Sequence, residues 1–448
     1  MSLQGKVAIV TGGNSGIGRA IVPRPLGSRQ MGNEPHVVIL GAGFAGVAAM
    51  KMLRKAPVRV TVINKNDYQA FQPLLYQVAT DVLSANEIGF PVRQMLHGHR
   101  AWAFHQAAVT GIDLGKRQVT VEGMEPISYD YLVIALGAVV NYFGTKGAEE
   151  HAFPLYTLAD AERLKTHVLE GLETVDKNPA LIDDGALRFC VVGGGPTGVE
   201  VAGAMAELLD TELKQDYPNL PLDKAEIHLY EAGPQLLGPF KPGLRDYAKR
   251  ALEKLGVRVH LGVGVVAVES NRVHLKSGEV IKAHTLVWGA GLQANPLVSS
   301  LGIDLVKGRV PVNPDLSLKD HPEVFAAGDV AIVTEPKTSR PLPQLGSVAK
   351  QAGEHVGRTI AGLLSGKGRI PFRYRDRGTM ATIGRGAAVA ELPAGFTLTG
   401  PIAWMGWLLV HLVLLSGSIE RSLTLRDWAW NILTRKRSKR IVVDVSRR

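Results

Sequence analysis

Two glycine-rich turns of the same spacing occur in this chain, and each has the residue types that a dinucleotide site requires. Both read G-x-G-x-x-G, and their glycines are Gly41, Gly43, Gly46, Gly193, Gly195 and Gly198. In such a turn the first glycine permits the bend, the second lets the backbone approach a pyrophosphate, and the third lets the next helix pack on the strand, while the helix N-terminus offers N–H donors. Either the chain binds two dinucleotides or one turn serves packing alone.

Three polar side chains follow apolar runs at places where a dinucleotide fold would use them. Glu231 closes the run 225–230 and could accept hydrogen bonds from ribose hydroxyls, which favours NADH over NADPH because a carboxylate repels a 2′-phosphate. Asn64 ends the run 58–63, behind the first turn. Asp329 ends another apolar strand and could hold the ribityl or pyrophosphate part of a flavin. An exposed strand-end carboxylate is the alternative interpretation of Glu231.

The chain contains one cysteine, Cys190, and this restricts its redox chemistry. A single cysteine cannot form an intrachain disulfide, a Cys-rich zinc or iron–sulfur site, or a dithiol redox pair. The histidines are scattered as well, so no metal site is predicted. Any redox chemistry must therefore come from a bound cofactor.

The elements that must position these residues alternate between strands and helices. Each glycine turn joins an apolar, β-branched run to a stretch of helix formers, and the second unit follows the first after about 150 residues. A length of 448 residues accommodates two or three domains. The composition, with 46% hydrophobic and 21% charged residues, excludes a disordered chain. The pattern predicts an α/β protein with two Rossmann-like dinucleotide-binding domains.

The C-terminal part differs in composition from the rest. The net charge of the chain is +10, and the last 33 residues carry nine Lys and Arg against three Asp and Glu. Residues 402–415 form the most apolar run, which as a helix spans about 21 Å, short of the roughly 30 Å hydrocarbon core of a bilayer. With the indoles of Trp404 and Trp407 and the basic run 435–440, this predicts a helix pair lying in one leaflet. A buried core helix is the alternative.

Several stretches together match a known family. They are 41–46, 71–80, 129–137, 193–200, 326–329 and 372–378, and the run 71–80 is the most specific. These stretches resemble the two-dinucleotide-binding-domain flavoproteins and, within them, the type II NADH:quinone oxidoreductases. The resemblance implies an FAD-binding domain, an NADH-binding domain inserted into it, and a C-terminal membrane-associating region. The FAD-binding domain is expected to comprise residues 34–150 and 296–375, and the NADH-binding domain residues 151–295. The membrane-associating region is expected to comprise residues 376–448.

The resemblance also implies roles for individual residues. FAD would be held by Gly41, Gly43, Gly46, Asn64, Ala135, Gly137 and Asp329, and NADH by Gly193, Gly195, Gly198 and Glu231. Glu200 would face the nicotinamide region, and Gln351 would orient a quinone on the opposite face of the flavin. Two positions depart from the family pattern, because Ser347 replaces a usual glutamine and Asn64 replaces a common acidic residue.

The activity implied by the resemblance is transfer of two electrons from NADH through FAD to a membrane quinone, without proton pumping. The enzyme is expected at the cytoplasmic face of the cell membrane as a peripheral, monotopic protein that contacts anionic lipid. No nucleic-acid partner is expected, and a homodimer is left open. One cysteine excludes the chemistry of the similar disulfide reductases and sulfide:quinone reductases. Two alternatives stay open: a soluble NADH-dependent flavin reductase or diaphorase, and an NADH-sensing flavoprotein with a basic interaction tail.

The first residues of the chain carry a separate signal. Residues 5–22 resemble the opening of a short-chain dehydrogenase, but Pro23 and Pro25 end its helix after little more than one turn. The flavin-binding strand then begins at His36, so no second strand completes a pocket. Residues 1–33 are therefore interpreted as an extraneous fragment with no function of its own.

Overall fold

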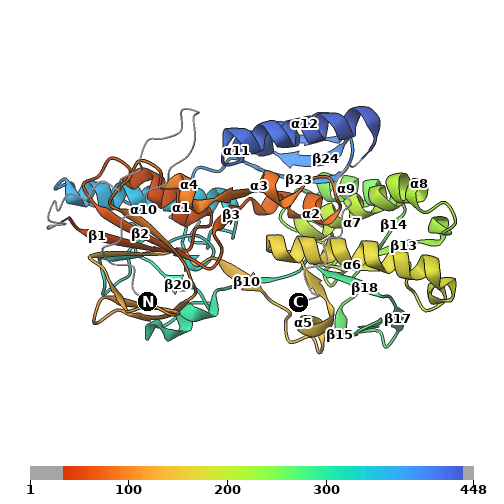
Figure 1. The fold of residues 1–448 in the computed structure, drawn as a ribbon, viewed down its shortest axis with the longest axis horizontal. Coiled ribbons are helices and arrows are strands. Elements are labelled where there is room, and N and C mark those ends of the chain that lie inside the picture. The colour runs from red at the N-terminus through yellow and green to blue at the C-terminus, as the bar shows by residue number, and fades with distance from the viewer. Residues whose placement is uncertain (1–33, 337, 437–448) are drawn as a thin grey trace, which may run out of the picture.

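A computed structural model describes residues 34–336 and 338–436 of the chain. The expectations for residues 1–33 and for the basic residues after 436 lie outside the described residues. Figure 1 shows two α/β halves side by side, with the helices α11 (Gly400–Leu414) and α12 (Ser418–Thr434) lying along one side of the molecule.

A five-stranded parallel sheet forms the first half, in the order β21-β9-β1-β2-β5. Its strands are β1 (His36–Leu40), β2 (Arg59–Asn64), β5 (Trp102–Gln106), β9 (Tyr131–Ile134) and β21 (Val324–Ala326). The helices α1 (Phe44–Leu53) and α10 (Gly346–Leu364) pack on each other closely, because a Cβ added at Gly353 would lie 2.0 Å from the Ala45 carbonyl oxygen. The late strand β21 therefore completes a sheet that the first residues begin.

A second five-stranded parallel sheet forms the other half, in the order β11-β18-β12-β13-β14. Its strands are β11 (Phe153–Pro154), β12 (Arg188–Val192), β13 (Glu226–Glu231), β14 (Val257–Leu261) and β18 (Thr285–Trp288). The helices of this half are α6 (Leu158–Lys177), α7 (Pro196–Leu208) and α9 (Pro242–Lys254). The prediction of an α/β protein with two Rossmann-like sheets is confirmed.

Shorter elements connect and flank the two sheets. The antiparallel pair β10 (Ala138–Val140) and β19 (Leu292–Ala294) joins the two halves. The other short strands are β3 (Tyr68–Ala70), β4 (Gly89–Pro91), β6 (Val109–Asp113), β7 (Gln118–Val121), β8 (Ile127–Ser128), β15 (Val265–Glu269), β16 (Arg272–Leu275), β17 (Val280–Lys282), β20 (Val310–Pro311) and β22 (Ala331–Ile332). The short helices are α2 (Leu75–Ala79), α3 (Ala85–Ile88), α4 (Val92–Met95), α5 (Ala148–His151) and α8 (Lys214–Asp216).

The C-terminal region consists of a small antiparallel sheet covered by a helix pair. The sheet contains β23 (Thr379–Gly384), β24 (Ala387–Glu391) and β25 (Thr397–Thr399), and α11 packs across it. The predicted helix over 402–415 is confirmed as α11, and Gly417, with φ of +111°, separates it from α12. Within the described residues, no helix is long and apolar enough to cross a membrane.

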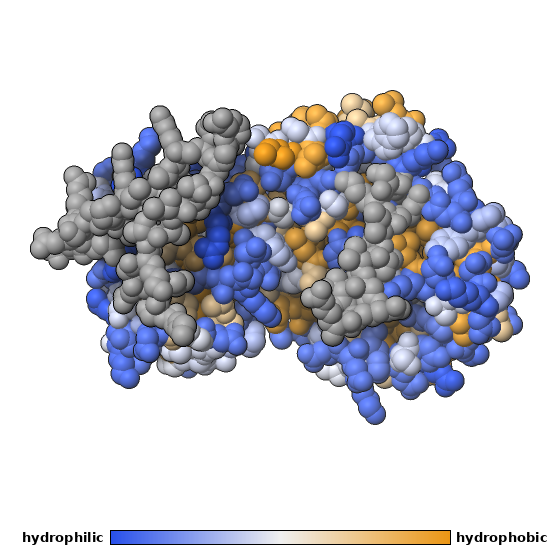
Figure 2. Space-filling view, in the orientation of Figure 1, coloured by the Kyte–Doolittle hydropathy of each residue, from blue (hydrophilic) through white to orange (hydrophobic). Residues whose placement is uncertain are grey.

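The helix pair has one face in the core and one face exposed. Trp407 was expected among interfacial indoles, and this expectation is wrong, because its side chain is 1% exposed and packs between Tyr76 and Trp428. Spacing along a helix does not show which side the body of the protein covers. The exposed apolar side chains are Ile402, Met405, Leu409, Val410, Val413, Leu414, Ile419, Leu425, Trp430, Ile432 and Leu433. Figure 2 shows apolar surface gathered along this edge of the molecule.

Candidate functional site

The first glycine turn has the shape of a pyrophosphate cradle. Gly41 has φ of +98°, and a Cβ there would lie 2.3 Å from the Ala135 carbonyl oxygen, so only glycine fits. A Cβ at Gly46 would lie 1.8 Å from the Gly41 carbonyl oxygen, which brings helix and strand together. At Gly43, in contrast, an added Cβ would meet no atom of the described residues within 4 Å. Open space at the N-terminus of α1 fits the diphosphate of FAD.

The second glycine turn repeats this geometry. Gly193 has φ of +108°, and a Cβ at Gly198 would lie 1.8 Å from the Gly193 carbonyl oxygen. Gly195 again leaves open space, with no described atom within 4 Å of an added Cβ. Both turns have the same constraint and the same opening, which favours dinucleotide binding over packing alone.

The strand-end residues Asn64 and Glu231 occupy equivalent places behind the two turns. Asn64 Oδ1 accepts a hydrogen bond from the Ala42 N–H at 3.0 Å, and Glu231 Oε2 accepts one from the Gly194 N–H at 2.5 Å. Glu231 Oε1 also accepts from the Gly233 N–H at 2.6 Å. A carboxylate has further lone pairs for ribose hydroxyls, whereas the Asn64 amide has fewer to offer.

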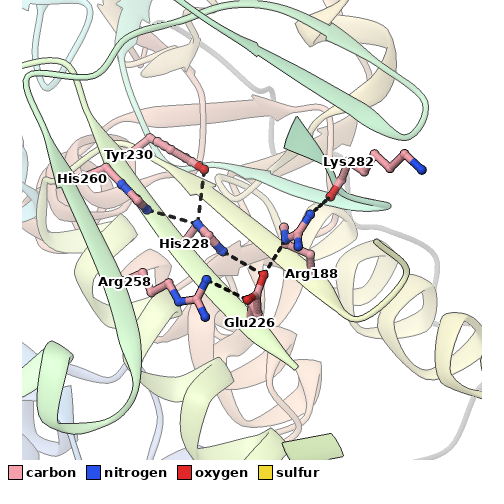
Figure 3. Close-up of polar contacts among 7 residues, drawn as sticks. All are labelled: Arg188, Glu226, His228, Tyr230, Arg258, His260 and Lys282. Atoms are coloured by element: carbon pink, nitrogen blue, oxygen red, sulfur yellow. Dashed lines mark hydrogen bonds and ion pairs between the residues drawn. The ribbon is translucent and has the colours of Figure 1, made fainter. Parts of the chain in front are cut away.

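A polar cluster holds the strands that carry the second turn in register (Figure 3). Glu226 accepts from Arg188 Nε at 2.7 Å and pairs with Arg258 Nη1 at 2.7 Å, so one carboxylate joins β12, β13 and β14. Burial opposes ionisation of Glu226, but hydrogen bonds from Arg188 and His228 outweigh it and lower the pKa. His228 Nδ1 lies 3.1 Å from His260 Nε2, and burial lowers the pKa of both rings. The cluster joins the N-terminal ends of these strands, and Gly193 and Glu231 lie at their opposite, C-terminal ends.

Asp329 and the segment 135–137 lie next to the first turn. The Ala135 N–H donates to the Leu40 carbonyl at 2.8 Å, which places this segment against the end of β1. Asp329 follows β21, two strands away from β1 in the same sheet. Burial raises the pKa of Asp329, and the nearby Arg309 guanidinium opposes this shift. The two predicted FAD contacts thus end up at one edge of the first sheet.

Glu200 lines a cavity between the second half and the C-terminal helices. The volume of the cavity is about 60 Å³, and the cavity is open to solvent on one side. Glu200 Oε1 accepts a hydrogen bond from the Thr382 N–H at 3.3 Å. The side chain keeps some accessible surface, yet the protein around it removes the carboxylate from bulk water and raises its pKa to about 8. At neutral pH this group is therefore mostly protonated.

The cavity has an apolar wall and a polar rim. Trp404, Leu408 and Trp428 come from α11 and α12, and Tyr76 comes from α2. The rim residues are Glu207, Arg385 and Asn431. Arg385 Nη2 donates to the Asn431 carbonyl at 2.5 Å, and the Arg385 N–H donates to Glu207 Oε1. No sequence motif indicated these rim residues, because they come from α7, α12 and the turn after β23, which are far apart in the sequence.

Gln351 lies on α10 and does not line this cavity. Its Nε2 donates to the Arg375 carbonyl at 3.0 Å, and its Oε1 accepts from the Arg375 N–H at 3.0 Å. One turn earlier, the Ser347 and Tyr374 hydroxyl oxygens are 3.0 Å apart. Both side chains therefore fasten the segment 372–378 to the N-terminal part of α10.

Proteins of known sequence resemble this chain along most of its length. A family model described as pyridine nucleotide-disulphide oxidoreductase matches residues 35–353. The chain is 36% identical over 430 residues to the type II NADH:quinone oxidoreductase Ndh of Mycobacterium tuberculosis, which covers 91% of this chain and 90% of the relative. It is 32% identical over 360 residues to the type II NADH:quinone oxidoreductase of Staphylococcus aureus, with 79% and 88% covered.

Solved structures share the fold. NDH2 from Plasmodium falciparum in complex with NADH matches with a TM-score of 0.83 at 20% identity, covering 92% of this chain and 100% of that chain. The sulfide:quinone oxidoreductase of Aquifex aeolicus matches with a TM-score of 0.67 at 19% identity, covering 90% and 96%. At these identities the likeness concerns the arrangement of the elements and not the chemistry.

Proposed function

Since the chain belongs to the type II NADH:quinone oxidoreductases, within the pyridine nucleotide-disulphide oxidoreductase family, we propose how its residues divide the work of that activity. The protein is an FAD-dependent enzyme that passes two electrons from NADH to a quinone. The observation that carries the proposal is the cavity beside Glu200, because one wall belongs to the NADH-binding half and another to α11 and α12.

FAD fits the first turn. We assign its binding to the residues described above, namely Gly41, Gly43, Gly46, Asn64, Ala135, Gly137 and Asp329. When bound, FAD accepts two electrons from NADH and passes them on to the quinone. The chain itself supplies no thiol for a disulfide step, since burial raises the pKa of its single Cys190 to about 12.

NADH is assigned to the second turn, through Gly193, Gly195, Gly198 and Glu231. The N-terminus of α7 presents N–H groups to the diphosphate, and Glu231 accepts from the ribose hydroxyls. Glu200, on the first turns of α7, faces the cavity that α11 and α12 close, so we assign it to the quinone and not to the nicotinamide. A 2′-phosphate would meet the Glu231 carboxylate, so NADH is the preferred donor.

The quinone is assigned to the cavity between α7, β23 and the C-terminal helix pair. Indole and leucine side chains suit an apolar ring and tail, and reduction of a quinone to a quinol takes up two protons. Glu200 holds a proton at neutral pH and lines the cavity, so it can orient the quinone and donate a hydrogen bond to its oxygen. Gln351 supports the quinone side indirectly, by fixing the segment 372–378.

The helix pair is the proposed site of peripheral membrane association, with the apolar faces of α11 and α12 in one leaflet. Arg435 and Lys436 follow α12 and would approach anionic headgroups at the cytoplasmic face. The cavity would then open close to the lipid from which a hydrophobic quinone arrives. Electron transfer at such a site needs no proton pumping.

A variant that fills the cavity tests the assignment. In Leu408→Trp, reoxidation of the reduced flavin by quinone should slow about tenfold or more, while reduction by NADH keeps its rate. The matched control is Leu409→Trp, whose parent side chain is 64% exposed on the neighbouring face of α11. Both half-reactions are followed by stopped-flow absorbance under anaerobic conditions. Equal quinone rates in the two variants would place the quinone elsewhere.

A further inference from the structure

Tyr156 reaches from the NADH-binding half to the proposed flavin site. It lies in the short connection between β11 and α6. Its hydroxyl oxygen accepts a hydrogen bond from the Ala138 N–H at 3.4 Å. A Cβ added at Gly137 would lie 3.7 Å from the same oxygen. The hydroxyl therefore sits beside the segment that we assign to FAD, although it comes from a different half of the molecule.

The hydroxyl of Tyr156 is a permanent donor. Burial raises the pKa of this phenol to about 12, and the negative charge of Asp329 acts in the same direction. The proton thus stays on the oxygen throughout the range in which the enzyme works. Among the described residues no acceptor for this proton lies within hydrogen-bond distance, and the one bond that the oxygen accepts is long. Buried hydroxyl groups normally have a partner.

The connection that carries Tyr156 is held firmly in place. Asp160 Oδ2 accepts from the Tyr156 N–H at 3.2 Å and from the Thr157 N–H at 2.8 Å. In return, Thr157 Oγ1 accepts from the Asp160 N–H at 3.1 Å, which completes a capping box at the start of α6. Arg163 pairs with the other Asp160 oxygen at 2.5 Å. A donor on such a support keeps its position without a ligand.

We propose that Tyr156 is an FAD-binding residue whose hydroxyl donates a hydrogen bond to an acceptor oxygen or nitrogen of the flavin ring. The inference rests on the FAD site assigned above and goes beyond it, because no glycine turn or strand-end motif indicates this residue. The contact joins the NADH-binding half to the flavin. Charge gathers on the flavin acceptors on reduction, so the donor stabilises the reduced form more than the oxidised form.

The test compares Tyr156→Phe with Tyr142→Phe. Tyr142 is a partly buried tyrosine that packs on Trp288 of the second sheet at 5.5 Å between ring centroids, and its substitution is the matched control. FAD is removed and titrated back, and the dissociation constant is read from flavin fluorescence. We expect Tyr156→Phe to weaken FAD binding about five- to tenfold, to shift the flavin absorption bands, and to lower the flavin midpoint potential. Tyr142→Phe should leave all three unchanged.

The outcomes separate this inference from the proposed function. Thermal melting of both apoproteins checks that the substitution leaves folding intact. If Tyr156→Phe binds FAD with the parent affinity, spectrum and potential, the inference is wrong while the FAD site stands. If the parent protein itself retains no FAD and cannot be reconstituted with it, the proposed function fails first. A loss of affinity with the spectrum and potential unchanged would also overturn the inference, because it would mean that the hydroxyl only supports the protein.

Discussion

Replacing Glu200 by glutamine should stabilise the folded protein at alkaline pH. Burial raises the pKa of this carboxyl to about 8, compared with 4.5 for an ordinary glutamate. Between these values the folded state binds more protons than the unfolded state, so stability falls as the pH rises. The contribution of Glu200 is fully present below pH 4.5 and is lost as the pH passes through about 8. Glutamine has nearly the same shape and does not ionise.

The size of the effect follows from the shift of the pKa. A difference between 4.5 and about 8 corresponds to at most about 5 kcal/mol of stability at high pH. The Thr382 N–H favours the carboxylate, and the accessible surface in the cavity lets water reach it. We therefore expect Glu200→Gln to gain roughly 2–4 kcal/mol at pH 9 relative to its effect at pH 5.

The assay is urea unfolding of the holoenzyme with excess FAD at pH 5, 7 and 9. The control is Glu253→Gln on α9, whose parent side chain is 42% exposed, and it should change stability little at any pH. Reoxidation of the reduced flavin by quinone should decline above about pH 8 in the parent enzyme and stay flat in Glu200→Gln. A stability difference that is the same at all three pH values would refute the burial argument.

Three further predictions concern the other assigned parts. In the parent enzyme, kcat/KM should be at least tenfold higher for NADH than for NADPH, which corresponds to about 1.4 kcal/mol. Glu231→Gln should reduce this ratio. If the ratio is unchanged, Glu231 does not contact the ribose. Gln351→Ala should displace the segment 372–378 and thereby raise the KM for quinone, while single-turnover reduction of the flavin by NADH keeps its rate. Slower flavin reduction would place α10 on the NADH side. Truncation before Pro401 should abolish co-sedimentation with liposomes, whereas deletion of 434–448 should leave weaker, salt-resistant binding; full retention by the shorter protein would move the membrane contact elsewhere.

The glycine turns could be predicted because their geometry is local. The positive φ at Gly41 and Gly193 and the close contacts at Gly46 and Gly198 involve the strand and helix that each turn joins. The spacing of the glycines in the sequence therefore largely determines the conformation of each turn. Glu231 was predictable for the same reason, since it ends the strand next to the second turn and bonds to that turn's backbone.

The cavity could not be predicted in this way, because its parts come from distant segments. Glu200 was named through a family resemblance, but its raised pKa depends on β23 and on helices that begin two hundred residues later. The same packing explains why Trp407 is buried, although the apolar run suggested an exposed indole. Apolar character alone does not distinguish a residue that faces Tyr76 from one that would face lipid.

The two turns differ in one respect that gives Tyr156 its importance. At the second turn the Glu231 carboxylate accepts two backbone hydrogen bonds and still has lone pairs for a ribose. At the first turn the Asn64 amide accepts from the Ala42 N–H and donates to the Asn66 carbonyl at 2.7 Å, so it can offer FAD one neutral lone pair and one N–H but no charged acceptor. Recognition of FAD must therefore rest more on groups outside the turn. Tyr156 is a donor of this kind, and because it belongs to the NADH-binding half, FAD binding would also fix how the two halves face each other.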